Sequence, residues 1–470
     1  MKVSDGPHPE QDGTIPRRTF LASAAAVSAF TIVPRHVLGG QAGPAPSDKL
    51  NLAGIGIGGM GKNNLRACET ENVVALCDVD FGEATEEVFA RYPDAKRYRD
   101  YRVMFDERDD IDAVIVATPD HTHAVIAMAA IARKKHVYVQ KPLTHSVYET
   151  RLLTEAAREH GVATQMGNQG RSGEGVRLMC EWVWDGAIGK VREAHGWTNR
   201  PVWPQGVEIG RPADTPPLPP GLDWDLWLGP ARERPYHPSY HPGKWRAWCD
   251  FGTGSLGDMG CHILDPLFWA LELRYPSAVE ANISKHFHEF WEETQPRNEM
   301  YPRSSIVRFR FPARSRKFPE LDLTWWDGGL MPPRPAELEP GRRMGDKDGG
   351  LLMIGEKGAI MSGCYGESPR IIPESRMQKY ARKKRKQKLE RVPEGKDGHE
   401  QDWIRACKGG PAACSSFEQS GPLSEMVLMG NLAVRFPDRQ LLWDGEAMKV
   451  TNDAEADAYV RRDYREGWSL

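Results

Sequence analysis

Residues 50–61 read Leu-Asn-Leu-Ala-Gly-Ile-Gly-Ile-Gly-Gly-Met-Gly, and this stretch decides the fold. Leu50–Gly56 is a short apolar run typical of a buried parallel strand. Gly56, Gly58 and Gly61 then follow the G-x-G-x-x-G spacing, in which the glycines allow a tight turn, close approach of a pyrophosphate and close helix packing. The stretch therefore predicts a dinucleotide site made by Gly56, Ile57, Gly58, Gly59, Met60 and Gly61.

An acidic residue ends the next apolar run, Val73–Asp78, and lies 22 residues after Gly56. A carboxylate at that position binds the adenosine ribose hydroxyls of NAD. The same carboxylate would repel the 2′-phosphate of NADP, and Asp80 lies close by. The pattern therefore favours NAD over NADP.

Strands and helices alternate after the glycine-rich turn, which favours a parallel, doubly wound sheet. Residues 48–168 are accordingly predicted to form a Rossmann domain, and residues 169–450 a substrate and oligomerisation domain with an open, mostly antiparallel sheet. Residues 451–470 are assigned to a C-terminal tail. Further predicted strands are Ala113–Thr118 and His136–Val139, and predicted helices are Phe81–Tyr92, Ala124–Arg133 and Val147–His160.

The composition indicates a globular protein without a nucleic-acid partner. The chain has 470 residues, 40% hydrophobic and 27% charged, with a net charge of −3. No general excess of basic charge is present, and the basic run at 380–391 is interpreted as a solvated helix or loop. The eight cysteines show no C-x-x-C or metal-ligand spacing, so neither a disulfide framework nor a metal site is predicted.

The first 45 residues are predicted to be an export signal and linker. Residues 16–21 read Pro-Arg-Arg-Thr-Phe-Leu and precede an apolar stretch that ends at Val33. A twin arginine before a short apolar run is typical of the Tat pathway, so a periplasmic location is expected. The apolar run is too short for a membrane span, and no membrane anchor is expected after signal cleavage.

Three further segments carry polar side chains suited to chemistry. Ala117–His123 and Val139–Leu143 follow predicted strands, at the sheet edge where ligands bind in open α/β sheets. The third segment, Gly257–Asp265, places Asp258 and His262 four residues apart. On a helix these two residues share one face, and Asp265 is expected on that face too.

These motifs together resemble the glucose–fructose oxidoreductase/inositol dehydrogenase (Gfo/Idh/MocA) family. The resemblance rests on the glycine turn, Thr-Pro-x-His-x-His, a Lys-Pro dipeptide and the downstream D-x-x-x-H. It implies a Rossmann domain followed by an α/β domain whose open sheet mediates oligomerisation, as a dimer or tetramer. It places the family's catalytic lysine, aspartate and histidine on Lys141, Asp258 and His262. Gln140 stands where the family has glutamate.

The chemistry of these side chains agrees with those roles. An unperturbed histidine such as His262 titrates near neutrality and suits a general base. Lys141 can stabilise alkoxide charge or relay a proton. Asp258 can orient the base, hold a substrate hydroxyl or only cap a helix. The predicted cofactor contacts beyond the glycine turn and Asp78 are Thr118, Pro119, His121, His123, Gln140 and Lys141; the two histidines either approach the nicotinamide or cap the next helix.

The sequence also offers candidate contacts for a carbohydrate substrate. Twelve of the fifteen tryptophans lie between Trp182 and Trp326, where they can stack on sugar rings or fill the core. Asn168 and Gln169 follow another predicted strand end. The candidate substrate contacts are Asn168, Gln169, Trp245, Arg246 and Trp326.

Three functions remain open at this point. The first is NAD-dependent oxidation of a hydroxyl on a sugar, polyol or glycoside. Because an exported enzyme has little free NAD to exchange, a tightly bound and internally recycled cofactor is expected. The second is NAD-dependent glycoside hydrolysis by transient oxidation and elimination, which some relatives in the family perform. The third is non-catalytic binding of NAD or a sugar.

Overall fold

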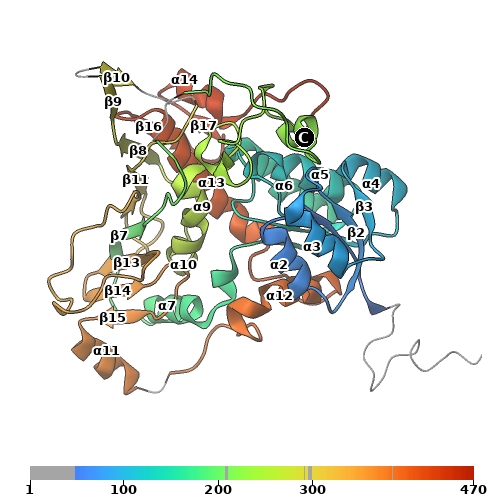
Figure 1. Cartoon of the computed structure of the whole chain (residues 1–470). Coiled ribbons are helices and arrows are strands. Elements are labelled where there is room, and N and C mark those ends of the chain that lie inside the picture. Colours follow the sequence, from blue (N-terminus) through green and yellow to red (C-terminus); the bar gives the residue numbers. More distant parts are fainter. Residues whose placement is uncertain (1–47, 207–209, 290–291, 295–298, 384) are drawn as a thin grey trace, which may run out of the picture. The chain divides into compact units, whose positions relative to one another are not determined.

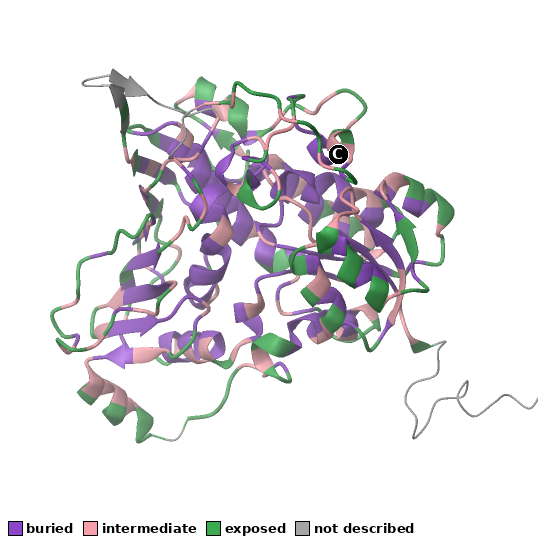
Figure 2. Ribbon diagram, in the orientation of Figure 1, coloured by how far each residue is buried: buried purple, intermediate pink, exposed green. Residues whose placement is uncertain are grey.

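The computed structural model describes residues 48–206, 210–289, 292–294, 299–383 and 385–470. The predicted export segment lies outside the described residues. Residues Leu50–Leu470 form one compact unit. Figure 1 shows its helices and strands, and Figure 2 shows that buried residues run through both sheets and helices α9 and α13.

The described N-terminal part contains a parallel six-stranded sheet, as predicted. Its strand order is β3-β2-β1-β4-β5-β6, the order of a dinucleotide-binding Rossmann domain. Strand order reverses between β1 and β4, and ligands of such sheets bind at that point. The strands are β1 (Asn51–Ile55), β2 (Asn72–Cys77), β3 (Lys96–Tyr98), β4 (Ala113–Val116), β5 (His136–Val139) and β6 (Thr164–Met166).

Helices cover this sheet between the strands. The predicted bounds of α6 hold because local signals fix both ends: Ser146 and Glu149 form a capping box, and Gly161 ends the helix in the left-handed conformation. Strand β3 and helix α4 were not predicted, since β3 is only three residues long and mostly exposed. The helices are α2 (Met60–Ala67), α3 (Glu83–Arg91), α4 (Tyr101–Glu107), α5 (His123–Ala132) and α6 (Val147–His160).

The second sheet is open and mostly antiparallel, which confirms the predicted fold class. Its nine described strands have the order β15-β14-β13-β7-β12-β11-β8-β16-β17. Within it β7 and β12 are parallel, and the other neighbouring pairs are antiparallel. The strands are β7 (Val191–Thr198), β8 (Ala278–Ile283), β11 (Ser305–Phe311), β12 (Leu321–Trp326), β13 (Gly349–Gly355), β14 (Gly358–Ser362), β15 (Arg370–Ile372), β16 (Gln440–Asp444) and β17 (Lys449–Val450); β9 (His286–Glu289) pairs with β10 (Glu292–Thr294).

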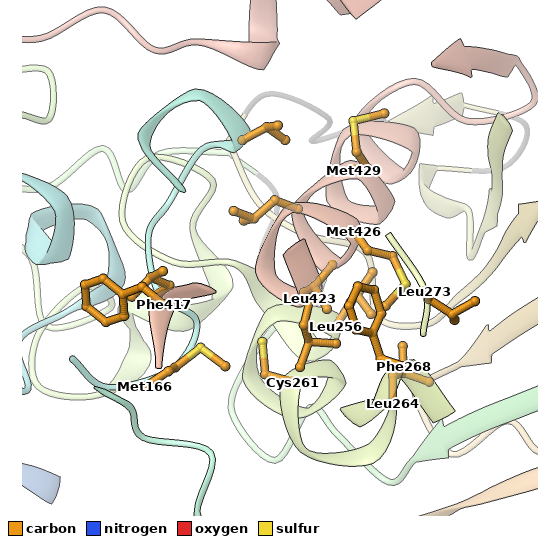
Figure 3. Packing of buried hydrophobic residues seen from close by; sticks show 14 of the residues in the cluster. Met166, Leu256, Cys261, Leu264, Phe268, Leu273, Phe417, Leu423, Met426 and Met429 are labelled. Atoms are coloured by element: carbon orange, nitrogen blue, oxygen red, sulfur yellow. The ribbon is translucent and has the colours of Figure 1, made fainter. Parts of the chain in front are cut away.

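Helix α13 joins the two halves of the unit. It packs against α6, α9 and β8, and its buried residues share one core with both sheets. Figure 3 shows side chains of α9, α10 and α13 within this core. The remaining helices are α7 (Glu174–Trp184), α8 (Trp224–Leu228), α9 (Gly254–Ile263), α10 (Asp265–Ala270), α11 (Glu374–Ala381), α12 (His399–Cys407), α13 (Phe417–Arg435) and α14 (Ala454–Asp457), with 3-10 turns at Asp120–Thr122, Gln169–Ser172, Lys244–Ala247, Gly395–Gly398 and Ala458–Val460.

Helix α12 returns to the Rossmann sheet although it lies far down the chain. Figure 1 shows α12 next to α2. Trp403 of α12 packs in one core with residues of β1 and α2, and its ring centroid lies 5.7 Å from that of Tyr138. The predicted second domain, residues 169–450, included this helix. The first domain is therefore completed by a segment distant in sequence.

The basic run at 380–391 is attached to the fold by ion pairs. Lys388 Nζ lies 2.5 Å from Asp185, and Arg391 pairs with Glu181 of α7 at 2.7 Å. Ion pairs therefore attach the end of this run to α7, while Arg382, Lys383 and Lys386 are exposed. Within the described part of the chain, no helix is both long and apolar enough to cross a bilayer.

Candidate active site

A cleft of about 830 Å³ opens at the point where strand order reverses. One wall is made by the glycine turn and the ends of β2, β4 and β5. The other wall is made by residues 241–246, by α9 and by Tyr365. The Rossmann domain and the second domain therefore face each other across this cleft.

The glycine turn is shaped for a dinucleotide. Gly56 has a φ of +80°, and a Cβ there would lie 2.6 Å from the backbone nitrogen of Thr118. A Cβ on Gly61 would lie 2.1 Å from the carbonyl oxygen of Gly56, so the helix can approach the strand only with glycine. Helix α2 begins without a side-chain cap or an acidic residue in its first turn. Its first N–H groups are therefore available to a pyrophosphate.

Asp78 stabilises the glycine turn through hydrogen bonds to its backbone. Its Oδ2 accepts hydrogen bonds from the backbone N–H of Ile57 at 2.7 Å and of Gly58 at 3.2 Å. Burial raises the pKa of Asp78. Asp78 and Asp80 both line the cleft, and Asp80 Oδ2 lies 2.9 Å from His241 Nε2. These acidic groups fit a dinucleotide with free ribose hydroxyls, while the preference for NAD over NADP stays a prediction.

Lys141, Asp258 and His262, predicted to be catalytic, line one part of the cleft. Lys141 Nζ donates to Asp258 Oδ1 at 2.6 Å and to the Asp258 carbonyl oxygen at 2.8 Å. Arg246 Nε and Arg200 Nε lie 3.5 and 3.7 Å from the same carboxylate. Although burial alone would raise it, the charges of Lys141 and Arg246 lower the pKa of Asp258 to about 2. Asp258 is therefore an anion at neutral pH.

His262 differs from the isolated histidine assumed from the sequence. It is buried, and its ring packs edge-on against Tyr365 at 4.8 Å. Burial and then the charge of Lys141 lower its pKa to about 3 rather than leaving it near neutrality. Among the described residues, no group hydrogen-bonds to the buried Nδ1. An unpartnered buried polar atom of this kind needs a functional or structural explanation.

Helix α9 positions Asp258 and His262. The prediction that Asp265 shares their helix face is wrong. Asp258 lies inside α9, not at its N-cap, which is Thr253. Because α9 ends at Ile263, Asp265 begins α10 and forms a buried ion pair with Arg171. Asn168 Nδ2 also donates to Asp265, at 3.3 Å. Neither Asp265 nor Asn168 is among the residues that line the cleft.

The two histidines of the Thr-Pro-x-His-x-His motif hold the backbone in place. His121 is fully buried outside the cleft lining, and its ring nitrogens contact the carbonyl oxygens of Trp227 and Phe251 at 3.0 and 3.3 Å. His123 lines the cleft, but its nitrogens contact the Pro142 and Thr118 carbonyl oxygens, each at 2.9 Å. Burial lowers the pKa of both histidines, so both are uncharged at neutral pH.

The other predicted contacts divide into two groups. Trp326 lies away from the cleft on β12, where its Nε1 donates to His195 at 3.4 Å. Arg246 stacks on Trp245 at 4.2 Å, so one face of that indole is already covered. Ile57 and Gly61 belong to the glycine turn but do not line the cleft. Predicted residues that line the cleft are Gly56, Gly58, Gly59, Met60, Asp78, Thr118, Pro119, His123, Gln140, Lys141, Gln169, Trp245, Arg246, Asp258 and His262.

Gln140 has a structural reason to replace glutamate. Its Nε2 donates to Asn64 Oδ1 at 3.0 Å, and Asn64 Nδ2 donates to Glu400 Oε1 at 2.6 Å. Glu400 comes from α12. A carboxylate at position 140 would face Asn64 Oδ1, which has no hydrogen to donate, so two acceptors would oppose each other. The amide therefore completes a buried chain that ends on a distant glutamate.

Asp120 is a further candidate functional residue, which was not predicted although it lies within the Thr-Pro-x-His-x-His motif. It lines the cleft, is 5% exposed, and accepts a hydrogen bond from Thr253 Oγ1 at 2.5 Å. Burial raises its pKa to about 7. Arg200 and Tyr365 were also missed, because no motif marks them and only the second sheet brings them to the cleft.

Comparison with protein-family models identifies both domains. Residues 50–168 match an oxidoreductase family with an NAD-binding Rossmann fold (GFO_IDH_MocA), and residues 187–290 match that family's C-terminal α/β domain. Two regions of the chain are therefore similar to the two domains of this family, and the match to its NAD-binding domain confirms the predicted cofactor class.

Curated relatives include dehydrogenases and a 2,7-anhydro-N-acetylneuraminate hydratase from Mediterraneibacter gnavus. An inositol 2-dehydrogenase from Salmonella paratyphi B is 29% identical over 147 residues, 30% of this chain and 44% of that protein. A levoglucosan dehydrogenase from Pseudarthrobacter phenanthrenivorans is 30% identical over 188 residues, 39% of this chain and 38% of that protein. The matched part thus spans less than half the length of either relative.

Solved structures share the fold. The WlbA dehydrogenase from Bordetella pertussis, crystallised with NADH and UDP-GlcNAcA, has a TM-score of 0.55 and 17% identity. The match covers 84% of this chain and 99% of that one.

Proposed function

We propose that this chain, which is similar to both domains of an NAD-binding oxidoreductase family, oxidises a hydroxyl group of a sugar, polyol or glycoside. The observation that carries the proposal is the placement of Lys141, Asp258 and His262 in the same cleft as the glycine turn. The names of two matched relatives give inositol and levoglucosan as substrates, and both names are those of dehydrogenases.

The residues of the Rossmann wall would hold the dinucleotide. The backbone of Gly58–Met60 suits its pyrophosphate, and Asp78 and Asp80 suit its adenosine ribose. When bound, NAD supplies the acceptor for the hydride that leaves the substrate carbon.

Lys141 suits the reacting hydroxyl. Two of its N–H groups bind Asp258, and the third can donate a hydrogen bond to the substrate oxygen. A positive charge at that position stabilises the negative charge that develops on the oxygen. Arg200 and Arg246 share the Asp258 carboxylate and limit the movement of this pair.

The hydroxyl proton needs an acceptor. His262 lines the cleft uncharged, so its imidazole can take the proton. A base with a pKa of about 3 holds a proton weakly at neutral pH, so the proton must pass to a stronger base. We assign this second role to Asp120, whose pKa of about 7 suits proton storage at the working pH.

Export and a captive cofactor form part of the proposal. The twin arginine at residues 17 and 18 supports transport by the Tat route to the periplasm, where free NAD is scarce. A protein exported with NAD already bound must regenerate it in place. The reaction would then be redox-neutral overall, through a second substrate or through return of the hydride to the first.

Glycoside cleavage is a second candidate, favoured by the presence of two proton-handling groups, His262 and Asp120, in one cleft. Transient oxidation of one hydroxyl acidifies the adjacent C–H. Loss of that proton would expel the glycosidic oxygen, which leaves with a proton; water then adds, and return of the hydride restores the alcohol. Unlike simple oxidation, this series of reaction steps requires two groups that can carry protons.

The decisive experiment is a product analysis with the purified mature protein. The protein is incubated with free sugars, polyols and glycosides, and products are identified by mass while the absorbance of reduced cofactor is followed. A keto-sugar supports oxidation, and a shortened sugar without net oxidation supports cleavage. If no substrate yields a product and none changes the redox state of the cofactor, the protein is a binder of NAD or sugar and the proposal fails.

The captive cofactor has a separate test. The purified protein is denatured, and the supernatant is assayed for NAD(H) by absorbance and mass. Close to one dinucleotide per chain is expected. Its absence would contradict tight retention without affecting the assignment of the reaction.

A further inference from the structure

A second cavity, of about 460 Å³, lies apart from the catalytic cleft and shares no lining residue with it. Its walls come from the start of α6, the last turns of α13, residues 249–250 and residues 458–463. Segments far apart in the sequence therefore build it together. The proposed function gives this cavity no role.

The lining of this cavity carries more positive than negative side chains. It is lined by five arginines (Arg211, Arg232, Arg435, Arg461, Arg462) and three carboxylates (Asp250, Glu299, Asp463). The carboxylates already have arginine partners: Arg234 pairs with Asp250, Arg211 with Glu299 and Arg232 with Asp463. The lining thus has a surplus of two positive charges.

Arg435 and Arg461 account for this surplus. Among the described residues, neither guanidinium has a carboxylate within ion-pair distance. Arg435 instead stacks over Tyr459 at 4.5 Å, and Arg461 stacks over Tyr148 at 4.1 Å. Stacking occupies the face of each planar group, and N–H groups at its edge can bind an oxyanion; in Arg435 part of that edge also contacts the Cys249 thiol.

We propose that this second cavity binds a small anion that carries phosphate or carboxylate groups. Guanidinium groups bind both through paired N–H donors, and such charge-assisted bonds are strong. Arg435 is half-buried, and a half-buried positive charge without a counterion is unfavourable, so a bound anion would stabilise it. The volume leaves room for a group larger than phosphate itself.

The cavity is connected to the catalytic cleft by hydrogen bonds. Asn431, which lines the cavity, donates from Nδ2 to the Thr253 carbonyl oxygen at 2.7 Å. Thr253 donates from its hydroxyl to Asp120 at 2.5 Å. Thr253 is also the N-cap of α9, the helix that carries Asp258 and His262. An anion in the cavity would therefore act on the position of α9 and on Asp120.

The test uses the full chain with its dinucleotide site saturated with NAD, since a free glycine turn would also attract phosphate. Inorganic phosphate and malonate are titrated separately by calorimetry at low ionic strength. Saturable binding of one anion per chain is expected, and the stronger of the two identifies the preferred group. Arg461→Gln, an exposed position, is expected to weaken binding by about tenfold or more.

Two further variants make the result specific. Arg435→Gln is expected to weaken binding as well, and its thermal midpoint shows whether it still folds. Arg439→Gln is the matched control, because Arg439 pairs with Asp453 at 2.9 Å and does not line the cavity. The proposal is overturned if neither anion binds saturably, or if Arg461→Gln binds as the unchanged protein does. Loss of self-association in Arg461→Gln without any anion binding would instead identify an interface between two copies.

Discussion

Replacement of Asp120 by asparagine tests the electrostatics of the catalytic cleft. Burial raises the pKa of this carboxyl from 3.8 to about 7. One pKa unit corresponds to about 1.4 kcal/mol, so ionised Asp120 disfavours the folded state by about 4 kcal/mol. Because the folded pKa lies above the unfolded one, this penalty is absent below about pH 4, grows as the pH rises and is complete above about pH 7.

Asparagine can still accept the Thr253 hydrogen bond but carries no ionisable group. The Asp120→Asn variant should therefore match the original protein near pH 4 and exceed its stability by about 4 kcal/mol near pH 8. For a chain of 470 residues the unfolding entropy is about 1 kcal/mol/K. The expected rise in Tm near pH 8 is accordingly about 4 °C.

Thermal unfolding of both proteins across this pH range measures the effect, with Asp94→Asn, an exposed position, as the control. The control should show little pH-dependent difference. In turnover assays, the Asp120→Asn variant should also lose the limb of the pH profile near pH 7. A Tm difference that is the same near pH 5 and pH 8 would refute the reasoning, because only an ionisable group with a raised pKa makes the difference grow with pH.

Two further predictions concern the residues beside the glycine turn and in the catalytic group. Lys141→Ala and His262→Ala should each lower kcat by about 100-fold or more while the dinucleotide stays bound; loss of the cofactor from both variants would make them fold supports instead. Gln140→Glu should destabilise the protein by about 1 to 3 kcal/mol, because it sets a carboxylate against Asn64 Oδ1, 3.0 Å from the present amide. Adding Glu400→Gln should restore the Tm by reversing the direction of the amide chain, and a double variant as unstable as the single one would disprove this account.

Local signals made much of the first domain predictable. The glycine turn, the apolar runs and the capping residues of α6 act over a few residues, so the sequence displays them directly. Asp265 shows where such reasoning ends. Helical spacing placed it with Asp258 and His262, but the helix stops at Ile263, and the side chain pairs with Arg171 instead.

Tryptophan content was only partly informative, because the predicted Trp245 lines the cleft and the predicted Trp326 does not. Aromatic clustering suggested a sugar site, yet Trp326 packs beside His195, away from the cleft. The sequence gives the position of an aromatic residue but not which face of the sheet it meets or what covers it. His121 likewise holds two distant carbonyl groups rather than lining the cleft.

The amino-acid sequence alone determined the Rossmann fold and the dinucleotide turn, because each depends on spacing within a short segment, and its resemblance to a known family added the candidate catalytic side chains. Only the tertiary structure decided that Lys141 meets Asp258, 117 residues away, and that Arg200 and Arg246 share its carboxylate. It also decided that His262 is a weak base and Asp120 a strong one for its type. The physical reason is that desolvation and Coulomb interactions depend on which groups packing brings together, and no local pattern in the chain records that.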